Sequence, residues 1–188
     1  MASGQGARPT LISGGHKGAE AEFGRAAKRW GVEQTTLSFA GHDMEWPVNV
    51  RALSDAELAQ GDVSMEIVSK RMGRIYHEAE RIRRVVQSLY AMVNEAYRVF
   101  AIGWIQPDDT VKGGTGWGVE LAKLFNRPVW VFDQARGEWF AWRDGHWVPE
   151  DPTLGDRTFA GTGTRNLSEA GRAAIADLFR RSLGEPRD

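Results

Sequence analysis

Apolar positions along the chain follow two patterns: short continuous runs, and longer stripes with helical spacing. The short runs are rich in β-branched and aromatic residues, which is typical of strands that are covered on both faces. They predict strands at residues 9–13, 35–39, 98–103, 128–132 and 158–160. Because the strands alternate with helical stripes, we expect an α/β fold: a doubly wound, mainly parallel sheet with helices on both faces.

The helical stripes predict helices over residues 19–30, 62–94, 117–125 and 168–183. The second of these is a long amphipathic crossover, for which we expect a break near Gly73. The polar segment 41–54 before it is predicted to be an irregular loop that covers a site. After the fourth strand, Asp144-Gly145 is a strong turn signal. It predicts a β-hairpin over residues 137–149, appended to the sheet, with Trp142 across from Trp147.

Length and charge narrow the function classes. The 188 residues are expected to form a single domain over 1–188, in which residues 1–8 are a flexible tail. With 24 basic and 25 acidic residues, the chain lacks the basic excess typical of nucleic-acid binding, and no apolar stretch is long enough for a membrane span. It also has no cysteine, which excludes disulfides and thiolate chemistry. We expect a cytoplasmic protein with a small-molecule ligand, no nucleic-acid partner and no membrane partner.

Glycine-rich turns follow three of the predicted strands, at residues 13–18, 112–116 and 161–166. Glycine lacks a Cβ atom, so its N–H group can approach an anion closely, and the helix that follows directs its free N–H groups to the same place. In parallel sheets, loops at the carboxyl ends of the strands meet at one edge, near the point where the strand order reverses. The three turns therefore predict a common site for a phosphate-bearing ligand. Their spacing fits neither a P-loop nor the dinucleotide fingerprint.

Two of these turns resemble known motifs. The segment 113–120 (GGTGWGVE) resembles the GGxGTxxE signature of the LOG proteins, also called lysine decarboxylase-like, and the segment 13–20 (SGGHKGAE) resembles the start of the wider SLOG superfamily. The segment 159–165 is similar to one found in some SLOG proteins. The resemblance implies a Rossmann-like fold that binds nucleotides or their derivatives. For the LOG enzymes it also implies hydrolysis of the N-glycosidic bond of nucleoside 5′-monophosphates.

The resemblance also implies roles for single residues. Glu120 matches the catalytic glutamate of the LOG enzymes, and Trp117 stands where that family has threonine. Arg83 and Arg84 are the nearest candidates for the family's upstream arginine–lysine pair. From the residues alone, Glu120 either stabilises positive charge at an anomeric carbon or complements the dipole of its helix.

The turns and their surroundings supply the candidate site residues. Residues expected to bind phosphate are Ser13, Gly14, Gly15, Lys17, Gly18, Gly113, Gly114, Thr115, Gly116, Thr162, Gly163, Thr164 and Arg165. Residues expected to contact a ribose or a base are Glu20, Trp104 and Trp117. His42, Asp43 and Glu45 have no spacing typical of a ligand set, so neither a metal nor a bound cofactor is expected.

Three functions follow from these observations. The first is a module that binds a nucleotide or a nucleotide-derived molecule. The second is a nucleoside 5′-monophosphate N-glycosidase (phosphoribohydrolase) that uses Glu120. A more distant alternative is a carrier of a phosphorylated cofactor of the molybdopterin type, because one branch of the SLOG superfamily bears that label. The amphipathic segment 62–94 is the expected contact of a homodimer.

Overall fold

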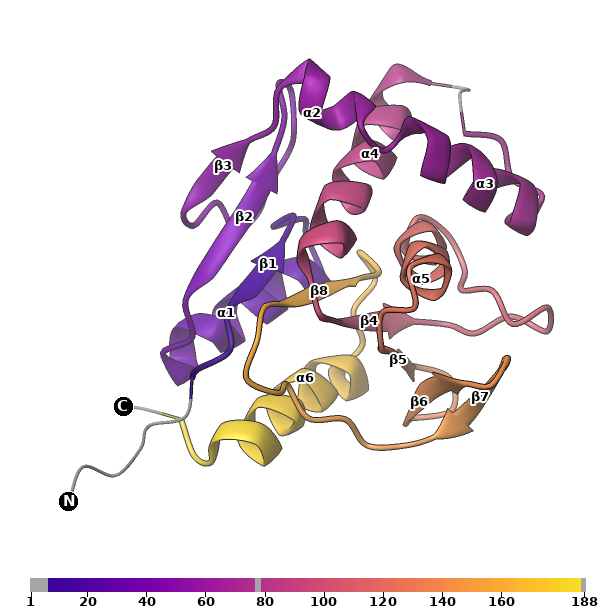
Figure 1. The fold of residues 1–188 in the computed structure, drawn as a ribbon. Helices are drawn as coiled ribbons and strands as arrows, with labels where there is room; N and C mark the ends of the chain where they lie inside the picture. The colour runs from indigo at the N-terminus through magenta and orange to yellow at the C-terminus, as the bar shows by residue number, and fades with distance from the viewer. Residues whose placement is uncertain (1–6, 77–78, 187–188) are drawn as a thin grey trace.

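An eight-stranded sheet runs through the protein in the order β3-β2-β1-β8-β4-β5-β6-β7 (Figure 1). The computed structural model describes residues 7–76 and 79–186. Neighbouring strands from β3 to β5 are parallel, whereas β6 and β7 are antiparallel. The predicted mainly parallel α/β sheet is thereby confirmed. The strands are β1 (Leu11–Ser13), β2 (Gln34–Ser38), β3 (Val50–Ala52), β4 (Arg98–Gly103), β5 (Val129–Asp133), β6 (Glu138–Arg143), β7 (His146–Pro149) and β8 (Phe159–Gly163).

Helices cover both faces of this sheet (Figure 1). The sheet therefore separates the core into two apolar clusters, one on each face. One face packs against α1 (Ala19–Trp30) and α6 (Glu169–Leu183). The other face packs against α2 (Asp55–Ala59), α3 (Asp62–Met72), α4 (Glu80–Glu95) and α5 (Thr115–Leu124). This arrangement explains why the sheet strands read as continuous apolar runs, since side chains on both faces are removed from water.

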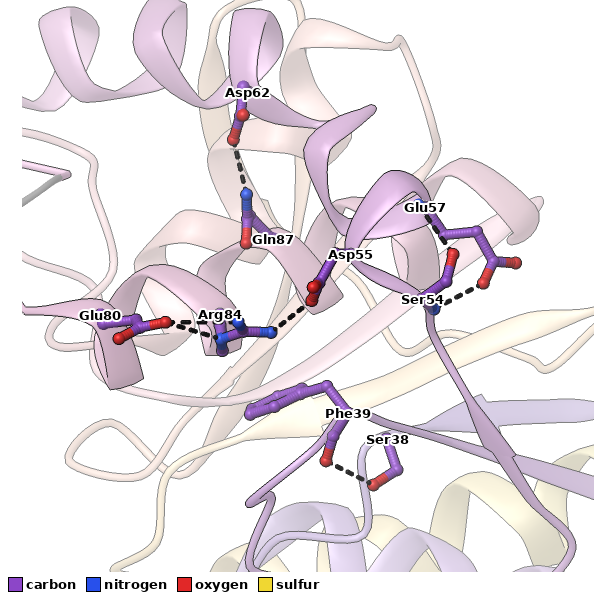
Figure 2. A network of polar contacts seen from close by, with 9 residues as sticks. All are labelled: Ser38, Phe39, Ser54, Asp55, Glu57, Asp62, Glu80, Arg84 and Gln87. Atoms are coloured by element: carbon purple, nitrogen blue, oxygen red, sulfur yellow. Dashed lines mark hydrogen bonds and ion pairs between the residues drawn. The ribbon is translucent and has the colours of Figure 1, made fainter.

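The structure corrects the prediction of an irregular loop over residues 41–54. This segment contains the edge strand β3, and Ser54 is the N-cap of the short helix α2. Ser54 Oγ accepts a hydrogen bond from Glu57 N at 3.2 Å, and Glu57 Oε2 accepts one from Ser54 N at 2.7 Å (Figure 2). This reciprocal capping box is visible in the sequence as Ser-x-x-Glu, but the segment was predicted to be a loop because its residues are mostly polar.

Polar contacts join α2 and α3 to α4. Arg84 pairs with Asp55 at 2.9 Å and with Glu80 at 3.3 Å, while Gln87 donates to Asp62 at 2.7 Å (Figure 2). The predicted break of the long crossover is confirmed, because α3 ends at Met72 and its C-cap, Gly73, has the left-handed conformation, with φ 63°. Residues 77 and 78, before α4, lie outside the described residues.

Strand β8 is longer than predicted and lies between β1 and β4 in the centre of the sheet. We expected Gly161 and Gly163 to belong to a turn, but both are strand residues. A Cβ on Gly161 would come within 2.5 Å of the Phe23 ring, and one on Gly163 within 2.5 Å of Ile102 O. These glycines therefore let helix α1 and strand β4 approach the backbone closely.

The predicted hairpin is present and continues the sheet, because β6 pairs with β5. Trp142 lies opposite Trp147 as expected, with ring centroids 5.0 Å apart. Of the tail expected over residues 1–8, residues 1–6 lie outside the described residues. In the part of the chain that the structure describes, no helix is long and apolar enough to cross a membrane.

Candidate functional site

A cavity of about 660 Å³ lies at the carboxyl ends of β1, β8 and β4. Strand order reverses here, since β2 and β3 extend the sheet on one side of β1 and β5 extends it on the other side of β4. Residues from all three glycine-rich turns line the cavity, as the parallel topology predicts. The cavity is within the volume range of small-molecule sites.

The start of α5 forms one wall of this cavity. Gly113 has φ 71°, and a Cβ on Gly113 or Gly114 would meet no atom within 4 Å, so this backbone borders open space. No side chain caps the N-terminus of α5. Behind the turn, Arg74 Nη1 donates to Gly113 O at 2.8 Å and Arg74 Nη2 to Val111 O at 3.0 Å. Arg74 thus holds the turn in place. Gly116 N and Trp117 N donate to Gly113 O and Gly114 O at 3.2 Å each, so the turn offers an anion mainly the positive end of the α5 dipole and the backbone before Gly116.

The turn after β8 forms the adjoining wall, which Thr164 and Arg165 line. Thr164 O accepts a hydrogen bond from Ala19 N at 3.0 Å, at the first residue of α1. A Cβ on Gly18 would come within 2.4 Å of Thr164 O. Gly18 therefore allows two of the turns to touch, and it does so without lining the cavity itself.

An apolar wall faces these turns. It consists of side chains of α4 together with two indole rings: Ile82, Val85, Val86, Leu89, Trp104 and Trp117. Lys112 Nζ lies 5.6 Å from the centroid of the Trp104 ring, within cation–π range. The cavity thus combines cationic and backbone donor groups with a flat apolar surface.

Glu20 lines the cavity although its side chain is removed from bulk water, with only 5% of the residue exposed. Glu20 Oε2 accepts a hydrogen bond from Gly14 N at 3.2 Å. A Cβ on Gly14 would lie 2.9 Å from both carboxyl oxygens, so a larger residue there would displace the end of the Glu20 side chain. Burial raises the pKa of Glu20 to about 8, against the smaller opposing effects of Gly14 N–H and Arg165. The carboxyl is therefore mainly neutral at pH 7.

His16 also lines the cavity and is joined to His42, with their Nε2 atoms 2.7 Å apart. Burial lowers the pKa of His16, and burial together with His16 lowers the pKa of His42 to about 4. Ser38 Oγ donates to Phe39 O at 3.5 Å (Figure 2). It accepts from His42 Nδ1 at 3.2 Å, which leaves His42 Nε2 as acceptor. From these bonds we assign His16 Nε2 as donor and His16 Nδ1 as the unprotonated nitrogen.

Glu120 lies outside the cavity. Lys123 Nζ donates to Glu120 Oε1 at 2.7 Å, and both side chains are buried. The same ammonium lies 3.8 Å from the centroid of the Trp142 ring and donates to Asp109 O at 3.0 Å. The pair therefore joins α5 to the β6–β7 hairpin. Glu120 is not placed to touch a ligand of the cavity.

The predicted site residues divide into two sets. Those lining the cavity are Glu20, Trp104, Gly113, Gly114, Thr115, Trp117, Thr162, Gly163, Thr164 and Arg165. Those that do not line it are Ser13, Gly14, Gly15, Lys17, Gly18, Gly116 and Glu120. Ser13 Oγ donates to Gly161 O at 2.8 Å, and a Cβ on Gly116 would lie 2.1 Å from Val111 O, so both serve packing.

Sequence reasoning missed several lining residues. The sequence left open whether His16 lies over a ligand or is a solvated loop residue, and it favoured the second; Arg81, Asn166 and the apolar face of α4 were not singled out as site residues. The stripe Ile82, Val86 and Leu89 was visible in the sequence, but nothing there showed that it faces a cavity. Arg83 and Arg84, in contrast, pair with Asp62 and Asp55 outside this cavity. Within residues 7–76 and 79–186, no group of three or more metal-ligating side chains occurs.

Comparisons with known proteins show a similar fold. No family model matches the chain, and no curated protein matches it. The fold is similar to the crystal structure of a protein from Syntrophus aciditrophicus described as a "putative molybdenum carrier protein". The TM-score is 0.52 at 13% sequence identity, and the match covers 93% of this chain and 94% of the other. The likeness supports the Rossmann-like α/β architecture.

Proposed function

We propose that this protein binds a nucleotide or a nucleotide-derived small molecule in the cavity at the carboxyl ends of β1, β8 and β4. The observation that carries the proposal is the meeting of three glycine-rich turns around one cavity, together with a cationic and an apolar wall. A phosphate group fits the uncapped start of α5 beside Lys112 and Arg165. A planar ring fits between α4 and the indoles of Trp104 and Trp117.

A carrier of a phosphorylated pterin-type cofactor is the second candidate. It is favoured by the likeness in fold to the protein described as a "putative molybdenum carrier protein", and the same walls suit a flat ring bearing a phosphate. Membership of the SLOG superfamily is consistent with both candidates. We do not propose the N-glycosidase that uses Glu120, because that carboxylate pairs with Lys123 away from the cavity.

Thermal-shift and calorimetric titrations test the proposal. The panel consists of nucleoside 5′-monophosphates, dinucleotides and a phosphorylated pterin. A ligand at 100 times its Kd stabilises the native state by about 2.7 kcal/mol. For a domain of this size, that raises the melting temperature by about 5 to 10 °C.

Two variants locate the binding site. Arg165→Gln should weaken binding at least about tenfold, because it removes a cation from the cavity. Arg172→Gln is the matched control, since Arg172 lies on α6 and pairs with Glu22 outside the cavity. If no phosphate-bearing ligand raises the melting temperature, or if both variants bind like the parent protein, the proposal is wrong. Preference for the pterin over every nucleotide would favour the carrier.

A further inference from the structure

Glu20 lines the cavity, and one of its two carboxyl oxygens forms no hydrogen bond with the described residues. Glu20 Oε2 accepts from Gly14 N at 3.2 Å, whereas Oε1 has no hydrogen-bond partner among the described residues. The residue as a whole is 5% exposed, but Oε1 is not among the fully buried side-chain atoms that lack a partner, so this oxygen reaches the open space of the cavity that Glu20 lines. A carboxyl oxygen that has no protein partner and borders a cavity is a place where a ligand can supply the hydrogen bond.

The protein offers Glu20 little that would stabilise a negative charge. Within the described part of the chain, Glu20 forms no ion pair, and it accepts one backbone hydrogen bond, from Gly14 N. Arg165 attracts the charged form only through space, and burial outweighs it. A carboxyl group in these surroundings keeps its proton. Because Gly14 N–H occupies Oε2, the proton belongs on Oε1, the oxygen without a partner.

We propose that Glu20 is a specificity-determining residue that binds the ligand as a neutral acid, donating a hydrogen bond from Oε1 to a phosphate oxygen, so that the ligand binds together with one proton. This inference rests on the proposed function. The opposite role, a carboxylate that accepts from a ribose hydroxyl, would place an unpaired charge in the same cavity as the phosphate. Two anions in one poorly solvated cavity repel each other, whereas a neutral donor and an anion attract.

The other titratable groups around the cavity change charge in a different pH range from Glu20. Besides Glu20, those lining it are His16, Arg81, Lys112 and Arg165. Burial and the neighbouring arginines keep the pKa of His16 below 6.5, and His42 behind it titrates near 4. Asp43 opposes both of these shifts. The histidines therefore change charge below pH 6.5, well separated from Glu20, whose pKa is about 8.

The test measures affinity against pH for adenosine 5′-monophosphate and for ribose 5-phosphate. A phosphate monoester loses its second proton near pH 6, so its charge stays constant above pH 7.5. The parent protein should bind with nearly constant affinity up to about pH 8 and lose affinity about tenfold for each further pH unit. Calorimetry at pH 8.5 in two buffers of different ionisation enthalpy should show net proton uptake by the complex.

Glu20→Gln separates the two roles, because an amide can donate a hydrogen bond but does not titrate. This variant should retain affinity at pH 7 within about fivefold and lose the pH dependence above pH 8. Glu22→Gln is the matched control, since Glu22 lies on the same helix, outside the cavity, and pairs with Arg25 and Arg172. It should follow the parent protein at every pH.

Three results would overturn the inference. They are constant affinity of the parent protein from pH 7.5 to 9.5, an unchanged pH dependence in Glu20→Gln, and loss of binding by a folded Glu20→Gln at pH 7. Each leaves the proposed function standing, because the parent protein still binds. Absence of binding by the parent protein at every pH would instead refute the proposed function, and this inference with it.

Discussion

Replacing Glu20 by glutamine is expected to make the folded protein more stable at neutral and alkaline pH. The carboxyl is buried without an ion pair in the described structure, and its pKa rises from 4.5 to about 8. Between these two values the folded state holds a proton that the unfolded state has released. Stability therefore falls as pH rises through this window, and glutamine, which does not titrate, escapes the loss.

The magnitude follows from the width of that window. Each pH unit between 4.5 and about 8 removes about 1.4 kcal/mol from the free energy of unfolding of the parent protein. Relative to the parent protein, the free energy of unfolding of Glu20→Gln should therefore be little changed near pH 4.5 and higher by at most about 5 kcal/mol at pH 8. Above pH 8 the difference should stay constant. At pH 8 the melting temperature should rise by up to about 10 to 20 °C.

Urea unfolding of both proteins at intervals from pH 4.5 to 9 measures the difference directly. Glu120→Gln is an informative control, since Glu120 is as buried as Glu20 but pairs with Lys123 at 2.7 Å. That substitution leaves a buried ammonium with a weaker partner and should destabilise the fold. A gain for Glu20→Gln that does not change with pH, or a loss at pH 8, would refute the reasoning.

Three further predictions concern other parts of the structure. Gly163→Ala should cost about 2 to 4 kcal/mol by urea unfolding, because φ is 148° and the new Cβ would lie 2.5 Å from Ile102 O. Lys123→Met should cost about 3 to 5 kcal/mol by leaving Glu120 buried without its partner, and adding Glu120→Leu should restore most of the loss; equal stability of the single and double variants would contradict this. The parent protein should lose stability as pH falls from 6.5 to about 4, because the folded pKa of His42 is depressed and the unfolded state takes up the proton first. His42→Phe should make this loss smaller, and identical pH profiles of the two proteins in thermal unfolding would count against it.

Much of the fold could be predicted because its signals are local. The apolar runs of β4 and β5, the amphipathic stripe of α1 and the Asp144-Gly145 turn each specify an element within a few residues. Strand β3 was missed because it is a three-residue edge strand whose residues are all exposed, so it leaves no apolar run. Strand β8 was predicted too short, since its glycines serve packing against Phe23 and Ile102, residues distant in the sequence.

The site was predictable only as far as topology places it. Parallel strands bring the turns after β1, β4 and β8 to one edge, and Thr115, Thr164 and Arg165 line the cavity there. Which helix face turns toward the cavity depends on side-chain packing, which no local pattern shows. Glu120 was therefore assigned to the site on its motif, whereas Lys123 and the hairpin hold it elsewhere. For His16 the solvated-loop interpretation was favoured over a place beside the ligand, because its partner, His42, lies in a loop distant in the sequence.

The central place of β8 has a consequence for synthesis on the ribosome. Strands β1 and β4 each pair with β8 and not with each other. Until residues 159–163 have emerged from the exit tunnel, the nascent chain holds two partial sheets with open inner edges. Such edges invite intermolecular pairing, so a ribosome that stalls shortly before this strand should release an aggregation-prone or chaperone-bound product.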